Sequence, residues 1–177
     1  MISNSVFKLS VLALGTVALV ACSNSEKKQI AAESYVDWVD PLIGSGGHGH
    51  VFVGASIPHG MIQLGPNNNK KGWDWCSGYH DSDSTIIGFA HTHLSGTGIA
   101  DLGDILLMPA VSVIDSAGYL PSSAYVSTFL KQEELVTPGF YQVKLHPSGV
   151  NVELTAGERV GMHRYVYPSD KKAQVVV

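Results

Sequence analysis

Short apolar runs separated by turn-forming residues recur along most of this chain of 177 residues. The runs are rich in β-branched and aromatic residues, and stretches such as Gly65-Pro66-Asn67-Asn68 and His146-Pro147-Ser148-Gly149 interrupt them. β-Branched and aromatic side chains favour extended backbone, whereas Gly, Pro, Asn and Ser favour turns. Outside the N-terminal segment no sustained helical periodicity competes with this pattern. The sequence therefore predicts an all-β fold, built as a two-sheet β-sandwich.

The runs that we expect to form strands are residues 51–53, 61–64, 85–93, 105–108, 111–114, 140–145, 150–154, 163–167 and 174–177. Residues 128–135 are expected to form a short turn of helix. The last run, Val175-Val176-Val177, stops inside an apparent strand without a closing turn, and an unpaired apolar strand edge is unfavourable. We therefore expect the domain to be incomplete at its C-terminus.

The first 21 residues have the pattern of an export signal. Lys8 precedes an apolar run from Leu9 to Val20 that is too short to span a bilayer. The following Leu19-Val20-Ala21-Cys22 resembles the lipobox of bacterial lipoproteins, which implies that Cys22 is acylated and becomes the first residue. An ordinary signal peptide or a buried helix is the alternative.

Residues 23–34 are polar and charged without periodicity, as expected of a flexible tether. We therefore expect a lipoprotein signal peptide at residues 1–21, a tether at 22–34 and a folded domain at 35–177. Cys22 would attach the exported protein to a membrane through lipid. The domain would then lie on the periplasmic or cell-surface side of the outer membrane.

Charge and cysteine content exclude several classes of protein. The formal charge of −4 becomes −5 without residues 1–21, because Lys8 is their only charged residue. No basic stripe interleaved with aromatic residues is present, so the sequence predicts no nucleic-acid partner. With Cys22 used for lipid, Cys76 is the only cysteine left, so no disulfide framework can stabilise the domain.

One segment concentrates the side chains that bind polar ligands. Residues 72–80 read Gly-Trp-Asp-Trp-Cys-Ser-Gly-Tyr-His, and His91, His93, Asp101 and Asp104 follow. A sugar ring offers an apolar C–H face that stacks on Trp or Tyr, and hydroxyls that need fixed donors and acceptors. This mixture therefore favours a pocket for a polyhydroxylated ligand.

The same residues have other interpretations. Trp73 and Trp75 could be core or rim aromatics, and Cys76 could be a small packed side chain without reactivity. His48 and His50, and likewise His91 and His93, are two residues apart, so in an extended chain the rings of each pair lie on one side. Such a pair could bind zinc with Asp101 or Asp104. Such a pair is only half of a zinc coordination shell, so hydrogen bonding is the competing role.

Linked motifs along the chain resemble glycoside hydrolase family 92. They are Val39-Asp40-Pro41-Leu42-Ile43-Gly44-Ser45-Gly46-Gly47-His48-Gly49-His50, Pro58-His59-Gly60-Met61-Ile62-Gln63-Leu64, residues 72–80 and 82–104, Leu106-Leu107-Met108-Pro109, Thr137-Pro138-Gly139-Phe140-Tyr141 and residues 154–165. The match is weakest at residues 129–134, where the family tends to carry a histidine and this chain has Leu130-Lys131.

The resemblance implies an exo-acting α-mannosidase that cleaves terminal α-mannosides of glycans. Family members join an N-terminal β-sandwich to a larger (α/α)₆ barrel, with the active site between them and Ca²⁺ holding the mannose. They invert the anomeric centre, which requires a carboxylic acid and a carboxylate with a water between them. In the family that pair lies in the barrel, so the resemblance implies no catalytic residue in these 177 residues, and Ca²⁺ ligands mainly outside them.

This chain would then supply part of the substrate pocket. The resemblance and the side-chain chemistry together predict substrate-binding roles for Gly46, Gly47, His48, Trp73, Trp75, Cys76, His91, His93 and Asp101. A second class of function is open, namely a β-sandwich lipoprotein that binds carbohydrate without cleaving it.

Overall fold

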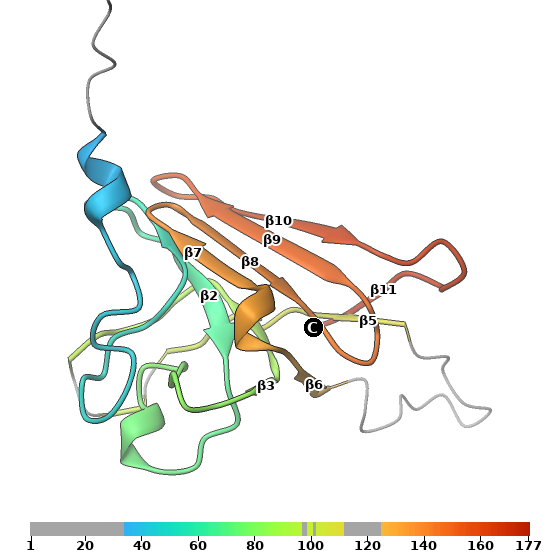
Figure 1. Cartoon of the computed structure of the whole chain (residues 1–177), viewed down its shortest axis with the longest axis horizontal. Coiled ribbons are helices and arrows are strands. Elements are labelled where there is room, and N and C mark those ends of the chain that lie inside the picture. Colours follow the sequence, from blue (N-terminus) through green and yellow to red (C-terminus); the bar gives the residue numbers. More distant parts are fainter. Residues whose placement is uncertain (1–33, 97–98, 101, 112–124) are drawn as a thin grey trace, which may run out of the picture. The chain divides into compact units, whose positions relative to one another are not determined.

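Short antiparallel strands make up most of the regular structure of the chain in the computed structural model (Figure 1). The structure describes residues 34–96, 99–100, 102–111 and 125–177, which belong to one unit from Ser34 to Val177. The expected signal peptide, the lipidation site Cys22 and the tether up to residue 33 lie outside the described residues. None of the helices described is long and apolar enough to cross a membrane.

The strands are β1 (Ala55–Ser56), β2 (Gln63–Asn67), β3 (Thr85–Ile86), β4 (Gly88–Ala90), β5 (Met108–Ala110), β6 (Ser127–Thr128), β7 (Glu134–Thr137), β8 (Phe140–Lys144), β9 (Asn151–Ala156), β10 (Gly161–Val166) and β11 (Gln174–Val176). Single turns of 3₁₀ helix are η1 (Tyr35–Trp38), η2 (Trp73–Trp75) and η4 (Lys131–Glu133).

The largest sheet is a four-stranded antiparallel meander in the order β10-β9-β8-β7 (Figure 1). Its register pairs Phe140 with Thr155 and Tyr165 with Val152. Along β8 and β9 the buried positions alternate with partly buried or exposed ones, because successive side chains of a strand point to opposite faces. One face of the meander is therefore apolar and must be covered.

Smaller sheets cover that face. β1, β2 and β4 form a three-stranded sheet, β5 pairs with β11, and β3 pairs with β6. β1 and β2 both contact β9. Within this layer the backbones approach closely at Gly65 of β2, where a Cβ atom would lie 2.1 Å from the carbonyl oxygen of Val53, just before β1. The buried side chains between the layers are Val53, Leu64, Tyr79, Ile86, Phe89, Met108, Phe129, Tyr141, Val143, Leu145, Val150, Val152 and Leu154.

The predicted all-β sandwich class is confirmed, with local differences. Residues 51–53 are not a strand, and pairing in this region begins instead with β1. The run at residues 105–108 becomes β5, which starts only at Met108. The helical turn expected at residues 128–135 shrinks to η4, because Glu134 to Thr137 pair with β8 instead. Residues 112–114 of the run at 111–114 lie outside the described residues.

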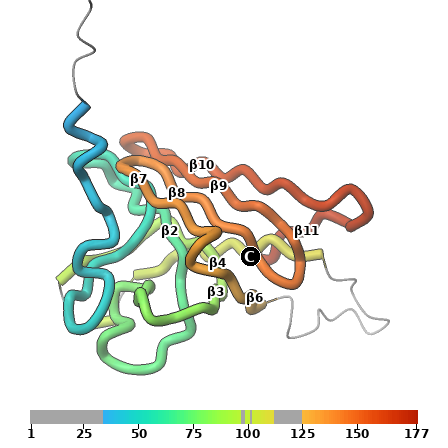
Figure 2. The backbone as a smooth tube through the Cα atoms, viewed as in Figure 1, coloured from blue at the N-terminus to red at the C-terminus, as the bar shows by residue number. Residues whose placement is uncertain are grey.

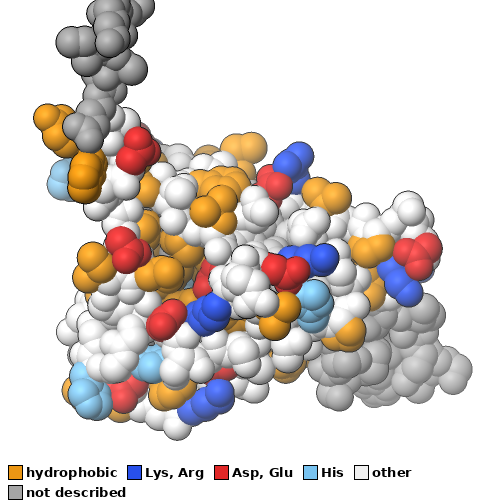
Figure 3. Space-filling view, in the orientation of Figure 1, with side chains coloured by type: hydrophobic (Ala, Val, Ile, Leu, Met, Phe, Trp, Pro, Cys, Tyr) orange, Lys and Arg blue, Asp and Glu red, His pale blue; other side chains and the backbone are white. Residues whose placement is uncertain are grey.

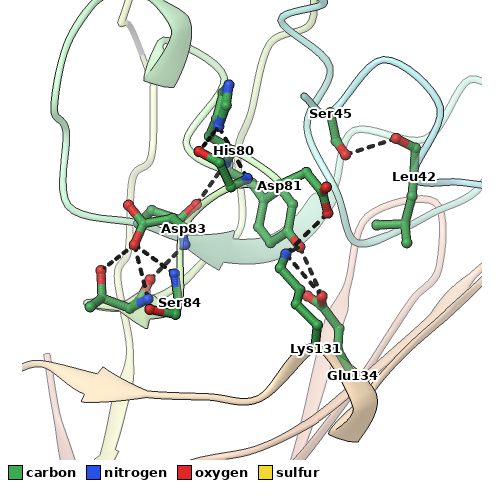
Figure 4. Close-up of polar contacts among 12 residues, drawn as sticks. Leu42, Ser45, His80, Asp81, Asp83, Ser84, Lys131 and Glu134 are labelled. Atoms are coloured by element: carbon green, nitrogen blue, oxygen red, sulfur yellow. Dashed lines mark hydrogen bonds and ion pairs between the residues drawn. The ribbon is translucent and has the colours of Figure 1, made fainter. Parts of the chain in front are cut away.

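A buried carboxylate joins the meander to the segment that follows β2 (Figure 4). The side chain of Glu134, in β7, is only 3% exposed and accepts hydrogen bonds from the hydroxyls of Tyr79 and Tyr141, both at 2.8 Å. Lys131 lies 3.3 Å from the same carboxylate and 3.2 Å from Asp81, and it also bonds the Tyr79 hydroxyl. Leu130-Lys131, the point of departure from the family pattern, thus supplies the cation of this cluster.

We expect Glu134→Ala to lower the free energy of unfolding by about 3 kcal/mol, because two buried phenol hydroxyls lose their acceptor. Denaturation in urea, followed by far-UV circular dichroism, measures this loss. Glu133→Ala is the matched control. Its carboxylate is partly exposed and pairs with His146 and Lys144, so it should cost less than about 1 kcal/mol. Equal losses in the two variants would show that the Glu134 cluster is not a special constraint.

Candidate functional site

Two loops that are distant in sequence lie side by side at one end of the domain (Figure 2). The first is residues 44–50, and the second is residues 72–83, which include η2. The backbone amide of Asp81 donates to the carbonyl oxygen of Ser45 over 2.9 Å. The ring Nε2 of His80 lies 3.1 Å from the carbonyl oxygen of Gly47. These contacts bring the predicted residues Gly46, Gly47 and His48 beside the aromatic segment.

Trp73 is exposed to solvent and has two histidine rings beside it. The residue is 63% exposed. The ring of His50 meets the Trp73 indole edge-on at a centroid distance of 4.3 Å, and the ring of His48 lies 6.4 Å from it. Figure 3 shows histidine, acidic and hydrophobic side chains next to one another at this end, over the region of η2.

Asp74 fixes both histidines. Its Oδ1 lies 2.7 Å from Nδ1 of His48 and 3.1 Å from Nε2 of His50. Hydrogen bonds from His48 and then from His50 lower the pKa of Asp74, so it is an anion at neutral pH. His48 is exposed, whereas His50 is buried and has a φ of 53°. An exposed indole beside polar groups that donate and accept hydrogen bonds has the chemistry that a sugar ring requires of its pocket.

His50 and Asp74 were not among the residues predicted for the site. The signal for them was present as the alternation His48-Gly49-His50 and as the position of Asp74 between two tryptophans. The sequence does not reveal that these two motifs meet, because 24 residues separate His50 from Asp74.

Trp75 does not share the exposed face with Trp73. Its indole Nε1 donates to Oδ2 of Asp83 over 2.9 Å, and its ring stacks on that of His80 at a centroid distance of 4.2 Å. Trp75 therefore helps to fix the conformation of residues 72–83. Replacing it by a smaller residue would disturb this loop as well as any contact to a ligand.

Asp83 is the second buried carboxylate of the region (Figure 4). Its side chain is fully buried and pairs with Lys71 at 2.9 Å. It also accepts hydrogen bonds from Trp75, from the amide of Ser84, and from the amide and hydroxyl of Thr85. Burial alone would raise the pKa of Asp83, but the hydrogen bonds, led by that of Lys71, lower it to about 2.

Cys76 and His93 line a cavity of about 150 Å³ behind the segment, together with Asn67, Asn68, Lys70, Trp75, Ser77, Gly78, Ile87, Ala100, Leu102 and Gly103. Ser77 is buried there, and its Oγ has no hydrogen-bond partner among the described residues. Nδ1 of His93 lies 2.7 Å from the carbonyl oxygen of Gln63, and Nε2 lies 2.7 Å from the side-chain amide oxygen Oδ1 of Asn67. Burial lowers the pKa of His93, so the ring is neutral at neutral pH.

His91 lies apart from His93 and contacts His163 of β10 instead. Asp101 lies outside the described residues. The described residues contain no group of three or more His, Cys, Asp or Glu that could hold a metal ion. The structure thus brings Gly46, Gly47, His48 and Trp73 together at one face and Trp75, Cys76 and His93 behind it, and it places His91 elsewhere.

A family model described as the glycosyl hydrolase family 92 N-terminal domain matches residues 38–177. The chain belongs to glycosyl hydrolase family 92. The matched region contains every part of the site described above, from the glycine-rich loop to β10. The two loops and the cavity are therefore features of a family 92 N-terminal domain.

Solved structures agree with this assignment. A family GH92 alpha-mannosidase from Bacteroides thetaiotaomicron, solved in complex with mannoimidazole, is 39% identical with a TM-score of 0.73, over 81% of this chain and 19% of that chain. A family GH92 inverting mannosidase from the same organism is 25% identical with a TM-score of 0.61, over 80% of this chain and 19% of that one.

A curated relative from Arthroderma benhamiae, named as an uncharacterized secreted glycosidase, is 29% identical over 138 residues. The match covers 74% of this chain and 17% of that protein. The family 92 domain thus spans about one fifth or less of the length of these relatives.

The low pKa of Asp83 predicts acid sensitivity. Because the folded state lowers this pKa to about 2 from the usual 3.8, its stabilisation is complete above about pH 4 and is lost as the pH falls toward 2. Asp83→Asn should lower the free energy of unfolding by about 2 kcal/mol at neutral pH and should flatten the decline between pH 4 and 2.

Urea titrations at a series of pH values, read by tryptophan fluorescence, test this. Asp170→Asn changes an exposed carboxylate, so its free energy of unfolding should fall between pH 4 and 2 as it does in the unmodified protein. If the free energy of unfolding of Asp83→Asn falls by the same amount over this range, the acid sensitivity does not come from Asp83.

Proposed function

We propose that this chain is the N-terminal domain of a longer, exported exo-α-mannosidase that hydrolyses terminal α-mannosides of glycans. Family membership and the named mannosidases among its structural relatives support this reaction class. The secreted glycosidase among the relatives supports export. The observation that carries a role for this chain is the exposed indole of Trp73, with His48, His50 and Asp74 fixed around it.

In this proposal the face formed by Gly46, Gly47, His48 and Trp73 is one wall of the substrate pocket. Stacking on an indole contributes about 1 kcal/mol beyond the burial of its area, and the polar atoms around Trp73 orient the sugar hydroxyls. Cys76 and His93 support the wall from the cavity behind it. The acid and the base for inversion would come from the remainder of the longer enzyme, held far enough apart to admit a water.

The proposed enzyme uses a calcium ion, but the described residues would supply few of its ligands. A calcium ion takes six to eight oxygen ligands, with carboxylates prominent among them. Since the described residues have no cluster of three candidate ligands, a calcium ion that orients mannose would be coordinated chiefly by residues outside them.

In the longer enzyme, Trp73→Ala should lower kcat/KM for an aryl α-mannoside by about tenfold, because the stacking surface is lost. Trp38→Ala is the matched control, since Trp38 is also an exposed tryptophan but lies in η1, outside the two loops. Steady-state kinetics of the two variants with the aryl α-mannoside measure this loss. Equal rates in Trp73→Ala and the unmodified enzyme would remove this face from the substrate pocket.

A binder without catalysis is the second candidate, because the Trp73 face is already formed within this chain. The purified chain, incubated with an aryl α-mannoside and calcium, should release no aryl group if the carboxylates for inversion lie elsewhere. Release by the chain alone would contradict that division of labour. The same assay on the longer protein separates enzyme from binder, since a binder would retain the mannoside intact.

A further inference from the structure

Two histidine rings meet edge to edge between the layers of the domain. His91 directly follows β4, and His163 lies in the middle of β10 with its side chain on the inner side of the meander. Their Nε2 atoms are 3.1 Å apart, and their ring centroids are 4.8 Å apart with an angle of 44° between the planes. Both residues are partly buried, and neither takes part in the Trp73 face.

The other ring nitrogens have partners that direct both Nε2 atoms toward the same space. Nδ1 of His91 lies 3.1 Å from the carbonyl oxygen of Ile105, which can only accept, so this nitrogen carries a proton. In a neutral His91, Nε2 is therefore unprotonated and has a free lone pair. Nδ1 of His163 lies 2.7 Å from the Tyr165 hydroxyl. Histidines that bind metals usually donate their second ring N–H to a carboxylate, a backbone carbonyl or a water, as His91 does to Ile105. When Nδ1 of His163 carries the proton and the Tyr165 hydroxyl accepts it, Nε2 of His163 also has a lone pair.

The separation of the two Nε2 atoms fits two ligands of one ion as well as it fits a direct hydrogen bond. Two nitrogens that are each bonded to the same tetrahedral Zn²⁺ lie roughly 3.3 Å apart. The 3.1 Å between Nε2 of His91 and Nε2 of His163 is close to this value.

We propose that His91 and His163 together bind one divalent transition-metal ion of the kind that prefers imidazole, represented by Zn²⁺, through their Nε2 atoms. The described residues offer no third His, Cys, Asp or Glu to this position, so water completes the coordination shell and the ion is exchangeable. Calcium, which prefers oxygen ligands, does not suit the site. The ion links the end of β4 to β10, and the site is independent of mannosidase activity.

The test uses the purified chain without an affinity tag, stripped of metal at neutral pH. Isothermal titration with Zn²⁺ should show one site, and bound Zn²⁺ should raise the unfolding temperature because it binds only the folded state. Ca²⁺ at the same concentration should do neither. His91→Asn and His163→Asn should each weaken Zn²⁺ binding by about tenfold or more. His59→Asn, at an exposed histidine, is the matched control and should change nothing.

A second variant leaves both ligands in place. A Cβ atom on Gly161 would lie 2.8 Å from Cδ2 and 3.2 Å from Nε2 of His91, so Gly161→Ala displaces that ring and should also weaken binding. In the unmodified chain, a trace of Cu²⁺ should broaden the imidazole NMR signals of His91 and His163 first. Broadening that begins at His48 or His59, or Zn²⁺ binding that survives all three variants, would overturn the proposal.

Discussion

Two buried carboxylates, Glu134 and Asp83, constrain the segment on which the candidate site is built. Glu134, in the meander, accepts a hydrogen bond from Tyr79. Asp83 pairs with Lys71 and accepts hydrogen bonds from Trp75, Ser84 and Thr85. A buried charge is tolerated only when it is paired and hydrogen-bonded, so each carboxylate fixes the positions of all its partners at once. A loop of this length would otherwise lose much conformational freedom on binding a ligand.

The consequence is a face whose side chains are already held by hydrogen bonds and ring contacts without a ligand. Trp75 and His80 are stacked and anchored beneath the loop, and this leaves Trp73 on the outside with His48, His50 and Asp74 in fixed positions. Preorganised groups bind more tightly because the cost of ordering them has already been met on folding. The domain spans about one fifth of the length of its structural relatives. In the proposed function, this face would form a pocket together with the remainder of the longer enzyme.

The sequence predicted the meander well and the site in part, for distinct physical reasons. In β8 and β9 the alternation of apolar and polar residues directly reflects burial on one face, so local pattern was sufficient. Residues 51–53 carried the same apolar character but remained unpaired, because strand formation depends on a partner that the local sequence does not specify. Likewise Trp73 and Trp75 look alike in sequence. Trp75 differs in its contacts, since its indole donates to Asp83, eight residues further along the chain, and stacks on His80. The pairing of His91 with His163 joins residues 72 positions apart, beyond the reach of any spacing rule.

The central claim is that the Trp73 face, held by these carboxylates, is a wall of the substrate pocket. A crystal structure of the longer enzyme with a non-hydrolysable α-mannoside tests it most directly. We expect a sugar ring with its centre within about 5–7 Å of the Trp73 indole, and no sugar contact to Asp83. A sugar bound well away from Trp73, with the indole instead packed against protein, would contradict the account.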